Sequence, residues 1–216
     1  SGLRDTEPHA AANLRGDTSY SSLRGPAAHR SSRATGIVFT KTGGHMQRLQ
    51  ISGVDLAVEI QGQGQPLIFV HGFPLDHTMW EAQIAEFSRD YHVLAPDLRG
   101  FGASDTGSGI ATMERFADDL AELADCLSLT ARGIVLCGLS MGGYIAFQFL
   151  RKYAALLRGL VLCNTRATAD SDEVRENRYR LATKVRQEGP EAVVHQMLPK
   201  LVSDETRRER PECLDR

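Results

Sequence analysis

The sequence predicts an α/β fold in which helices cover both faces of a mostly parallel β-sheet. Two short runs, LIFV at 67–70 and IVLC at 134–137, are wholly apolar, as expected of strands that are buried on both faces. Between such runs lie segments with apolar residues at helical spacing. Strands that alternate with helices along a chain favour parallel pairing, so these observations together indicate a parallel sheet between two helical layers.

The patterned part of the chain begins with an expected antiparallel hairpin. RLQI and VDLAVEIQG alternate apolar and polar residues on either side of Ser52-Gly53, a pair that suits a tight turn. GQGQP at 62–66 then breaks the pattern before the buried run at 67–70. This glycine-rich stretch precedes a strand and does not open a helix, so it does not predict a nucleotide site.

Helices and further strands follow in alternation. The segment 78–90 places Trp80, Ile84 and Phe87 on one helical face, and HVLAP at 92–96 is expected to be a strand. The remaining expected elements are a helix over 113–129, the strand at 134–137, a helix over 142–153 and a strand over 157–164.

Three regions follow from this pattern. Residues 1–45 are rich in Ser, Arg, Ala and Gly and have no apolar period. We expect them to be a disordered leader or a segment added by cloning, since GGHM at 43–46 resembles a cloning junction. Residues 46–165 are expected to form the N-terminal part of the α/β core. Residues 166–216 are charged and purely helical in period, and are expected to form a partial helical cap.

Composition and charge exclude several classes of partner. With 25 Lys and Arg against 27 Asp and Glu, the net charge of −2 gives no basis for binding nucleic acid or an anionic membrane surface. No apolar run approaches the roughly 20 residues of a transmembrane helix. Cys126, Cys137 and Cys163 lie in apolar segments without CxxC spacing, so we expect reduced core thiols and a cytoplasmic protein.

A serine between two glycines ends the apolar run IVLC. In GLSMG this serine, Ser140, follows an expected strand and opens an expected helix, which is the context of a nucleophile elbow. Gly138 and Gly142 would let strand and helix approach closely, while the strained turn would project the serine hydroxyl from the carboxyl end of the sheet. The Met141 amide would lie at a helix N-terminus, where the dipole favours a developing oxyanion.

The loop HGFP, which follows the run LIFV, lies where a second oxyanion donor is needed. The Phe73 amide is the candidate, because Pro74 has no amide hydrogen and Gly72 lets the backbone come close. His71 is expected to brace this loop through hydrogen bonds rather than to act as a base. Trp80 lies close enough to the loop to be a candidate for lining a substrate pocket. No spacing of potential ligands matches a common metal site, and no cofactor is expected.

Three stretches, HGFPLDHTMW at 71–80, DLRGFGASD at 97–105 and GLSMGGYIAF at 138–147, resemble successive signatures of the α/β-hydrolase superfamily. Within it they resemble the 3-oxoadipate enol-lactonases and small carboxylesterases. The resemblance implies an α/β-hydrolase fold and a nucleophilic serine followed in chain order by an acid and a histidine. The acid and the base are not found in the chain, which is expected to be C-terminally truncated, with the last strands of the sheet absent.

Polar residues downstream of Ser140 are interpreted as structural. His195 lies in a helical stretch and is expected to belong to the cap rather than to serve as the base. Asn164 ends a strand where some relatives place an acid, but an amide cannot stabilise an imidazolium as a carboxylate does. Three aspartates in polar runs are expected at the surface: Asp170, Asp172 and Asp204.

Five charged residues upstream of the serine are also interpreted as structural. Asp97, Arg99 and Asp105 are expected to pair with one another and to pin the loop after their strand. Asp118 and Asp119 are placed on the outer, solvated face of their amphipathic helix.

The expected function is hydrolysis of small carboxylic esters or lactones through an acyl-enzyme on Ser140. Activity is expected to be impaired in this chain, because no base is found. The alternatives are a non-catalytic fragment or, on the same fold, a perhydrolase or haloperoxidase-like enzyme or a carbon–carbon bond hydrolase. Self-association through a truncated sheet edge is a further expectation.

Overall fold

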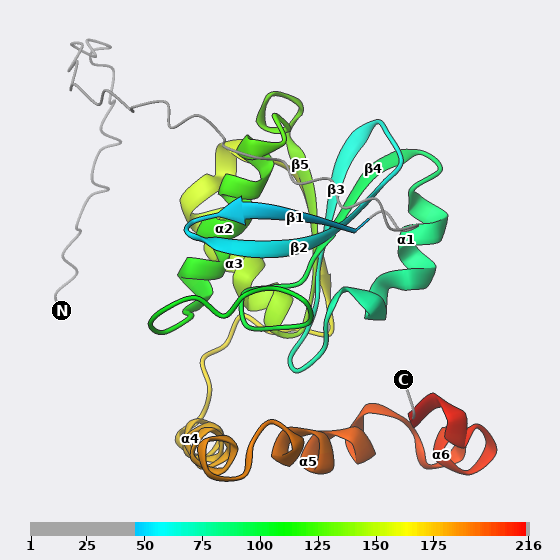
Figure 1. The fold of residues 1–216 in the computed structure, drawn as a ribbon, viewed down its shortest axis with the longest axis vertical. Helices are drawn as coiled ribbons and strands as arrows, with labels where there is room; N and C mark the ends of the chain where they lie inside the picture. Colours follow the sequence, from blue (N-terminus) through cyan, green and yellow to red (C-terminus); the bar gives the residue numbers. More distant parts are fainter. Residues whose placement is uncertain (1–45, 215–216) are drawn as a thin grey trace, which may run out of the picture. The chain divides into compact units, whose positions relative to one another are not determined.

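The structure, a computed structural model, describes residues 46–214, so the expected leader over 1–45 lies outside the described residues. The described residues form a six-stranded sheet in the order β1-β2-β4-β3-β5-β6 (Figure 1). This sheet and its flanking helices confirm the predicted α/β architecture. The strands are β1 (Met46–Ile51), β2 (Val54–Gln61), β3 (Gln65–Val70), β4 (Tyr91–Pro96), β5 (Ile134–Leu139) and β6 (Leu157–Cys163).

The sheet combines an antiparallel hairpin with a parallel part. β1 and β2 pair antiparallel, with Ile51 opposite Val54 across the turn at Ser52 and Gly53. β2 pairs antiparallel with β4, whereas β3 pairs parallel with both β4 and β5, and β5 pairs parallel with β6. The carboxyl ends of β3, β4, β5 and β6 therefore lie at the same edge of the sheet, the edge at which open α/β sheets bind ligands.

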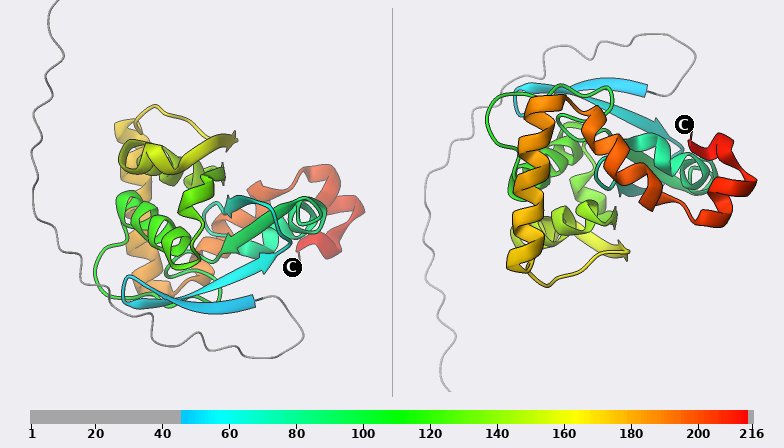
Figure 2. Two further views of the ribbon diagram at one scale, coloured as in Figure 1. Left: turned by 90° about the horizontal axis from the view of Figure 1, so that it is seen from above. Right: turned by 90° about the horizontal axis from the view of Figure 1, so that it is seen from below.

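Helices cover both faces of the sheet, as predicted. α1 (Glu81–Phe87), preceded by a 3₁₀ turn η1 (His77–Trp80), lies on one face, and α2 (Met113–Cys126) and α3 (Met141–Tyr153) lie on the other (Figure 1). Figure 2 shows the same separation from above and from below. Each face has its own apolar core because residues along each central strand point alternately to the two sides. The α1 side contains Leu67, Phe69, Trp80, Ile84, Val93, Ala95 and Cys137, and the larger core on the other side includes Ile68, Val70, Leu94, Leu136 and Phe149.

Three helices follow β6: α4 (Asp172–Glu188), α5 (Glu191–Leu201) and α6 (Asp204–Glu209). α4 and α6 begin at serine N-caps, Ser171 and Ser203, whose side chains accept backbone amide protons. None of the α4 side chains is buried, in keeping with its many charges. The charged, helical character of this region is therefore as predicted, while its role as a cap stays a prediction. None of the helices in residues 46–214 has the length and apolar character needed to cross a membrane.

β6 is an edge strand of the sheet among the described residues. β6 pairs with β5 on one side only, and its Val161 and Leu162 side chains are 45% and 43% exposed. An unpaired strand of this kind can template pairing with another chain. Self-association through it stays a prediction.

The expected pairing of Asp97, Arg99 and Asp105 is wrong, as is the expected exposure of Asp119. Asp119 is 1% exposed, and its two carboxylate oxygens each accept a hydrogen bond from the Arg99 guanidinium at 2.6 Å. The physical reason is the position of Asp119 on α2: it follows Phe116 by three residues and so borders the stripe that faces the core. Arg99 turns toward this buried carboxylate, and the resulting ion pair joins α2 to the loop after β4.

The expectation of core thiols holds for Cys137, which is buried. It is wrong for Cys126, which is exposed in the last turn of α2. Cys163, at the end of β6, is half-buried.

Candidate active site

Ser140 lies at the junction of β5, which ends at Leu139, and α3, which begins at Met141. Its backbone has φ 50° and ψ −107°, and such sparsely populated conformations cost about 1–3 kcal/mol for a residue other than glycine. Its side chain makes no capping hydrogen bond to α3, although serine is among the favoured N-cap residues. The turn thus holds a serine in a strained conformation without using its hydroxyl to cap the helix. This is the backbone geometry of a nucleophile elbow.

Glycines allow the strand and the helix of this elbow to meet at backbone distance. A Cβ atom on Gly138 would lie 2.4 Å from Gly142 O, and one on Gly142 would lie 2.3 Å from Val70 O. A Cβ atom on Gly143 would lie 2.3 Å from Thr165 Oγ1. Each of these distances is far inside van der Waals contact, so β3, β5 and the start of α3 can pack in this way only with glycine at these positions.

Ser140 is also held from the side of β6. Its backbone N–H donates to Cys163 O at 3.0 Å, and Thr165 Oγ1 donates to Ser140 O at 2.8 Å. These two bonds tie the elbow to the end of the neighbouring strand and to the residues just after it. Thr165 belongs to none of the sequence motifs, and its place two residues beyond the strand next to the elbow is the only signal that could have identified it.

The loop after β3 lies beside the elbow. A Cβ atom on Gly72 would lie 3.3 Å from Leu139 O and 3.5 Å from Ser140 Cβ, so residue 72 contacts the elbow directly. Leu75 N–H donates to Gly72 O at 2.9 Å and closes a turn around Phe73. The two expected oxyanion donors are the amides of Phe73 and Met141. Phe73 is the residue after Gly72 and Met141 is the residue after Ser140, so both donors lie next to this contact.

His71 lies at the base of this loop and is fully buried. Its Nε2 accepts the Leu98 amide proton at 3.0 Å. The ring proton is therefore on Nδ1, which donates to Gly72 O at 3.0 Å. Burial lowers the pKa of His71 below its usual value of 6.5, against the opposing effect of the bond to Gly72. Both ring nitrogens join the loop after β3 to the loop after β4, which leaves no lone pair to accept a proton from Ser140.

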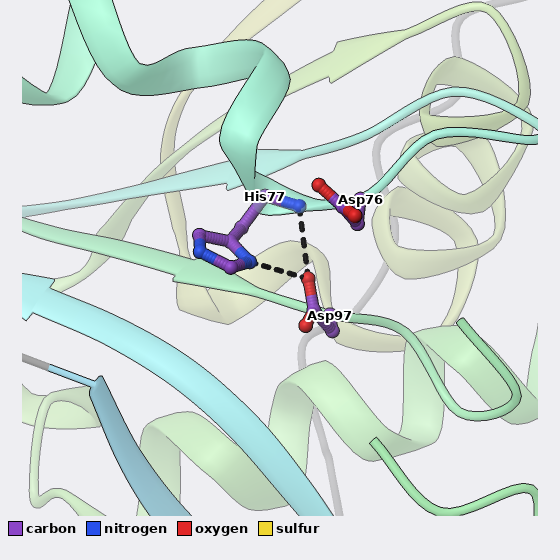
Figure 3. A group of neighbouring side chains, drawn as sticks. All are labelled: Asp76, His77 and Asp97. Carbon is purple, nitrogen blue, oxygen red and sulfur yellow. Dashed lines mark hydrogen bonds and ion pairs between the residues drawn. The ribbon is translucent and has the colours of Figure 1, made fainter. Parts of the chain in front are cut away.

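Asp76, His77 and Asp97 form a group of potential metal ligands whose ligand atoms lie within 4.8 Å of one another (Figure 3). Asp97 is buried, and its Oδ1 accepts the His77 amide proton at 2.8 Å and the Nδ1 proton of the same residue at 2.7 Å. Its Oδ2 accepts from the Ala103 amide at 2.8 Å. Asp76 Oδ1 accepts from the amide and the hydroxyl of Thr78. Internal hydrogen bonds thus occupy both oxygens of Asp97 and one oxygen of Asp76, and the bonds of Asp97 link the loop after β3 to the loop after β4.

Residues considered as possible acids or bases take other positions in the structure. Asn164 follows β6 with φ 41° and is exposed. Asp170 accepts hydrogen bonds from Arg178 at 2.6 Å and from Arg166 at 2.5 Å, and these bonds lower its pKa. Asp172 and Asp204 begin α4 and α6 as exposed residues, and His195 lies on α5 with a side chain outside the described ones.

Trp80, the expected pocket residue, lies in the apolar core on the α1 side. It is 6% exposed and stacks on Phe69 with ring centroids 4.8 Å apart. Its Nε1 is buried and has no hydrogen-bond partner among the described residues. A contribution of Trp80 to a substrate pocket stays a prediction.

Comparisons with known proteins identify the fold family of the chain. Residues 65–208 match the family model of the alpha/beta hydrolase fold. A thermophilic esterase from Thermogutta terrifontis is 49% identical and superposes with a TM-score of 0.73, over 79% of this chain and 64% of its own. The enol-lactonase from Burkholderia xenovorans LB400 is 30% identical, with a TM-score of 0.70 over 78% of this chain and 64% of its own.

A third relative, 3-oxoadipate enol-lactonase 1 of Acinetobacter baylyi, is 30% identical over 117 residues, which are 53% of this chain and 43% of that enzyme. The chain thus spans less than two thirds of the length of these relatives. The matched range, 65–208, contains both the HGFP loop and the GLSMG elbow. The chain belongs to the α/β-hydrolase fold family.

Proposed function

We propose that the protein is a serine hydrolase of carboxylic esters or lactones and that Ser140 is its nucleophile. The observation that carries this proposal is the strained backbone of Ser140, held at the carboxyl end of β5 with its hydroxyl unused for capping. Strain of this kind persists only where the surrounding structure imposes it, and it gathers at functional sites. The similarity to an esterase and to enol-lactonases supports the same class of substrate.

The amides of Phe73 and Met141 are the proposed oxyanion hole. Met141 is the first residue of α3, so its N–H is one of the free donors at a helix N-terminus. Phe73 follows Gly72, whose contact with Ser140 brings the two donor segments together. One such donor is worth about 2.7–4 kcal/mol of transition-state stabilisation.

The proposed reaction is a two-step acyl transfer. Ser140 Oγ attacks the carbonyl carbon, and the two amides stabilise the negative charge that develops on the carbonyl oxygen. The carbon–oxygen bond to the alcohol then breaks, which leaves an acyl group on the serine. Water attacks this ester, releases the carboxylic acid and restores the serine. None of these steps needs a metal or an organic cofactor.

The proton acceptor for Ser140 is proposed to be a residue that the structure does not describe. His71 uses both ring nitrogens in hydrogen bonds to Leu98 and Gly72, and His77 is bonded through Nδ1 to Asp97. An oxyanion hole and binding alone still accelerate acyl transfer by about 10³–10⁴-fold over water. We therefore expect the 216-residue chain, tested alone, to hydrolyse p-nitrophenyl acetate only weakly.

The test is labelling with a fluorophosphonate, which reacts with activated serines. It is applied to the 216-residue chain and to the longest protein that its reading frame encodes. We expect the longest form to be labelled and Ser140→Ala to abolish the label. Ser128→Ala is the matched control, because Ser128 also has positive φ, 56°, but lies in an exposed turn after α2.

Labelling of the Ser140→Ala protein at the parent rate would refute the proposed nucleophile. Strong, Ser140-dependent turnover by the 216-residue chain would instead leave the proposed nucleophile standing, and would show that a histidine within this chain, such as His195, accepts its proton.

A further inference from the structure

Two cysteines lie close to the elbow, on the neighbouring strands β5 and β6. Cys137 is on β5, Cys163 ends β6, and their sulfur atoms are 3.9 Å apart. In the parallel register Cys137 pairs with Val161 and Leu139 pairs with Cys163. The two cysteines are thus diagonal neighbours, offset by two residues, and their side chains point to the same face of the sheet.

The two thiols differ in their access to solvent. Cys137 is 5% exposed and belongs to the apolar core that also contains Phe69 and Trp80. Burial raises the pKa of the Cys137 thiol to about 12, and the neighbouring Cys163 adds to this effect. Cys163 is half-buried at the end of its strand. Cys163 is the more exposed of the two thiols, so a small reagent from solvent reaches it first. The raised pKa keeps the Cys137 thiol protonated at neutral pH, so its attack on an oxidised Cys163 is expected to be slow.

Both cysteines are connected to Ser140 through the backbone. Cys137 lies on β5 three residues before the serine, and the carbonyl oxygen of Cys163 accepts the Ser140 N–H at 3.0 Å. Any change in the spacing of these two strand ends therefore acts on the turn that presents the hydroxyl.

We propose that Cys137 and Cys163 are a site of oxidation by hydroperoxides, at which a reversible disulfide forms and disables the elbow. A disulfide needs sulfur atoms at about 2.05 Å and Cα atoms at roughly 4.4–6.8 Å. With parallel strands about 4.8 Å apart and a rise of about 3.3 Å per residue, Cα atoms offset by two residues on adjacent strands are about 8 Å apart. The bond therefore forms only if the ends of β5 and β6 move toward each other, which displaces the acceptor of the Ser140 amide. The effect on activity rests on the proposed role of Ser140, whereas the formation of the disulfide does not.

The chemistry balances with one peroxide for each disulfide. The Cys163 sulfur attacks a peroxide oxygen, the O–O bond breaks, and water (from hydrogen peroxide) leaves, so that Cys163 becomes a sulfenic acid. The Cys137 sulfur then attacks the Cys163 sulfur, the S–O bond breaks, and the hydroxyl leaves as water with the Cys137 proton. The two thiols lose two electrons in total, and the peroxide gains them. A dithiol such as dithiothreitol reverses the bond by thiol–disulfide exchange.

The experiment uses the longest protein form with the substitutions Cys126→Ser and Cys213→Ser. Of the four cysteines of this chain, only Cys137 and Cys163 then remain. Any cysteine that the longer form adds is replaced as well. Reduced protein is treated with hydrogen peroxide, free thiols are alkylated, and the intact mass is measured. We expect the loss of both alkylation sites, a peptide linked through Cys137 and Cys163, and recovery of both thiols with dithiothreitol.

Two further readouts separate the parts of the proposal. Trp80 is the single tryptophan of this chain and shares the apolar core of Cys137, so its emission is expected to change when the disulfide forms. The rate of fluorophosphonate labelling is expected to fall about a hundredfold on oxidation, the size of effect produced by a displacement of 1 Å at a reacting centre. Each variant is compared with its own reduced form, and Cys163→Ser is expected to lose all three responses.

The outcomes are distinct. Failure to find the linked peptide after peroxide treatment would overturn the oxidation site. A disulfide that leaves the labelling rate of the reduced protein unchanged would overturn the connection to the elbow. A reduced protein that is never labelled, yet forms the disulfide and changes its Trp80 emission, would overturn the proposed function and leave the oxidation site standing.

Discussion

The carboxyl ends of β5 and β4 lie at the same edge of the sheet, and both present a polar side chain there. At the end of β5, Ser140 has a strained backbone and does not cap its helix. After β4, Asp97 is buried and accepts three hydrogen bonds from His77 and Ala103. The polar group at the end of β5 is strained and does not cap its helix, whereas the one after β4 is hydrogen-bonded within the protein.

The difference teaches how a reactive group is told from a structural one when both lie at a strand end. A buried polar group whose capacity is filled by the protein stabilises the fold and has little left for a substrate. A group that the fold holds under strain, without engaging it in the local helix, lowers stability, and such strain gathers at functional sites. This difference supports the proposal that Ser140 is the chemical site and that Asp97 is part of its support.

The largest expected effect is at the β5 end, where Gly142→Ala would destroy the close packing of the elbow. Its Cβ atom would lie 2.3 Å from the backbone oxygen of Val70. We expect a loss of about 3 kcal/mol or more in the free energy of unfolding, since overpacking against backbone cannot be relieved by a side-chain rotation. Urea unfolding measures this change.

Gly159→Ala is the matched control for Gly142→Ala. Gly159 lies in β6, and a Cβ there would contact Val135 at 3.6 Å, an ordinary van der Waals distance. Its expected effect is below about 1 kcal/mol, as for a glycine replaced in a strand without a clash. Equal losses for the two variants would mean that the elbow is not packed more tightly than the rest of the sheet.

A smaller effect is expected at the β4 end, for Asp97→Asn. The amide keeps the shape of the carboxylate but offers one acceptor oxygen where His77 and Ala103 present donors to two. A buried donor left without a partner costs about 1–3 kcal/mol, and we expect a loss of that size in the free energy of unfolding. The rate of fluorophosphonate labelling of the folded protein should change much less.

Asp105→Asn is the control for Asp97→Asn, because Asp105 is an exposed aspartate of the same loop whose ion pair with Arg48 has an N–O distance of 3.8 Å. Exposed pairs of this kind contribute about 0–1 kcal/mol. If Asp97→Asn reduced labelling strongly while leaving stability unchanged, Asp97 would be a chemical group and the distinction between the two strand ends would fail.

The sequence allowed the elbow to be predicted because its signals are local. An apolar run, two glycines around a serine and a helical period all lie between 134 and 153, and each restricts the backbone directly. The pairing of Arg99 with Asp119 and of Asp97 with His77 could not be predicted in this way. In each pair the partners are 20 residues apart, and contact depends on how loops and helices pack. Thr165 was missed for the same reason, since its bond to Ser140 crosses from one strand end to the next.

His71 joins the loop after β3, which contacts the elbow, to the loop after β4, and its titration gives the last and smallest expected effect. Burial holds its pKa in the folded protein below the usual 6.5. Between these two pKa values the unfolded chain binds a proton that the folded protein does not, so the free energy of unfolding falls as the pH drops below about 6.5. A single proton limits this slope to about 1.4 kcal/mol per pH unit. His71→Gln should flatten the slope in urea unfolding curves measured across this range.

The control must account for His92, whose pKa is also lowered by burial, and secondarily by Arg132. His92→Gln should remove only its own part of the slope. Protonation of His71 has a second consequence that His92 lacks, because a charged ring can no longer accept the Leu98 amide proton. The loop after β3 should then loosen where it contacts Ser140. As the pH is lowered, the labelling rate of the parent protein in its longest form should therefore decrease more steeply than its free energy of unfolding. The His71→Gln variant should not show this difference. A parallel fall in both variants would show that His71 braces the fold without acting on the elbow.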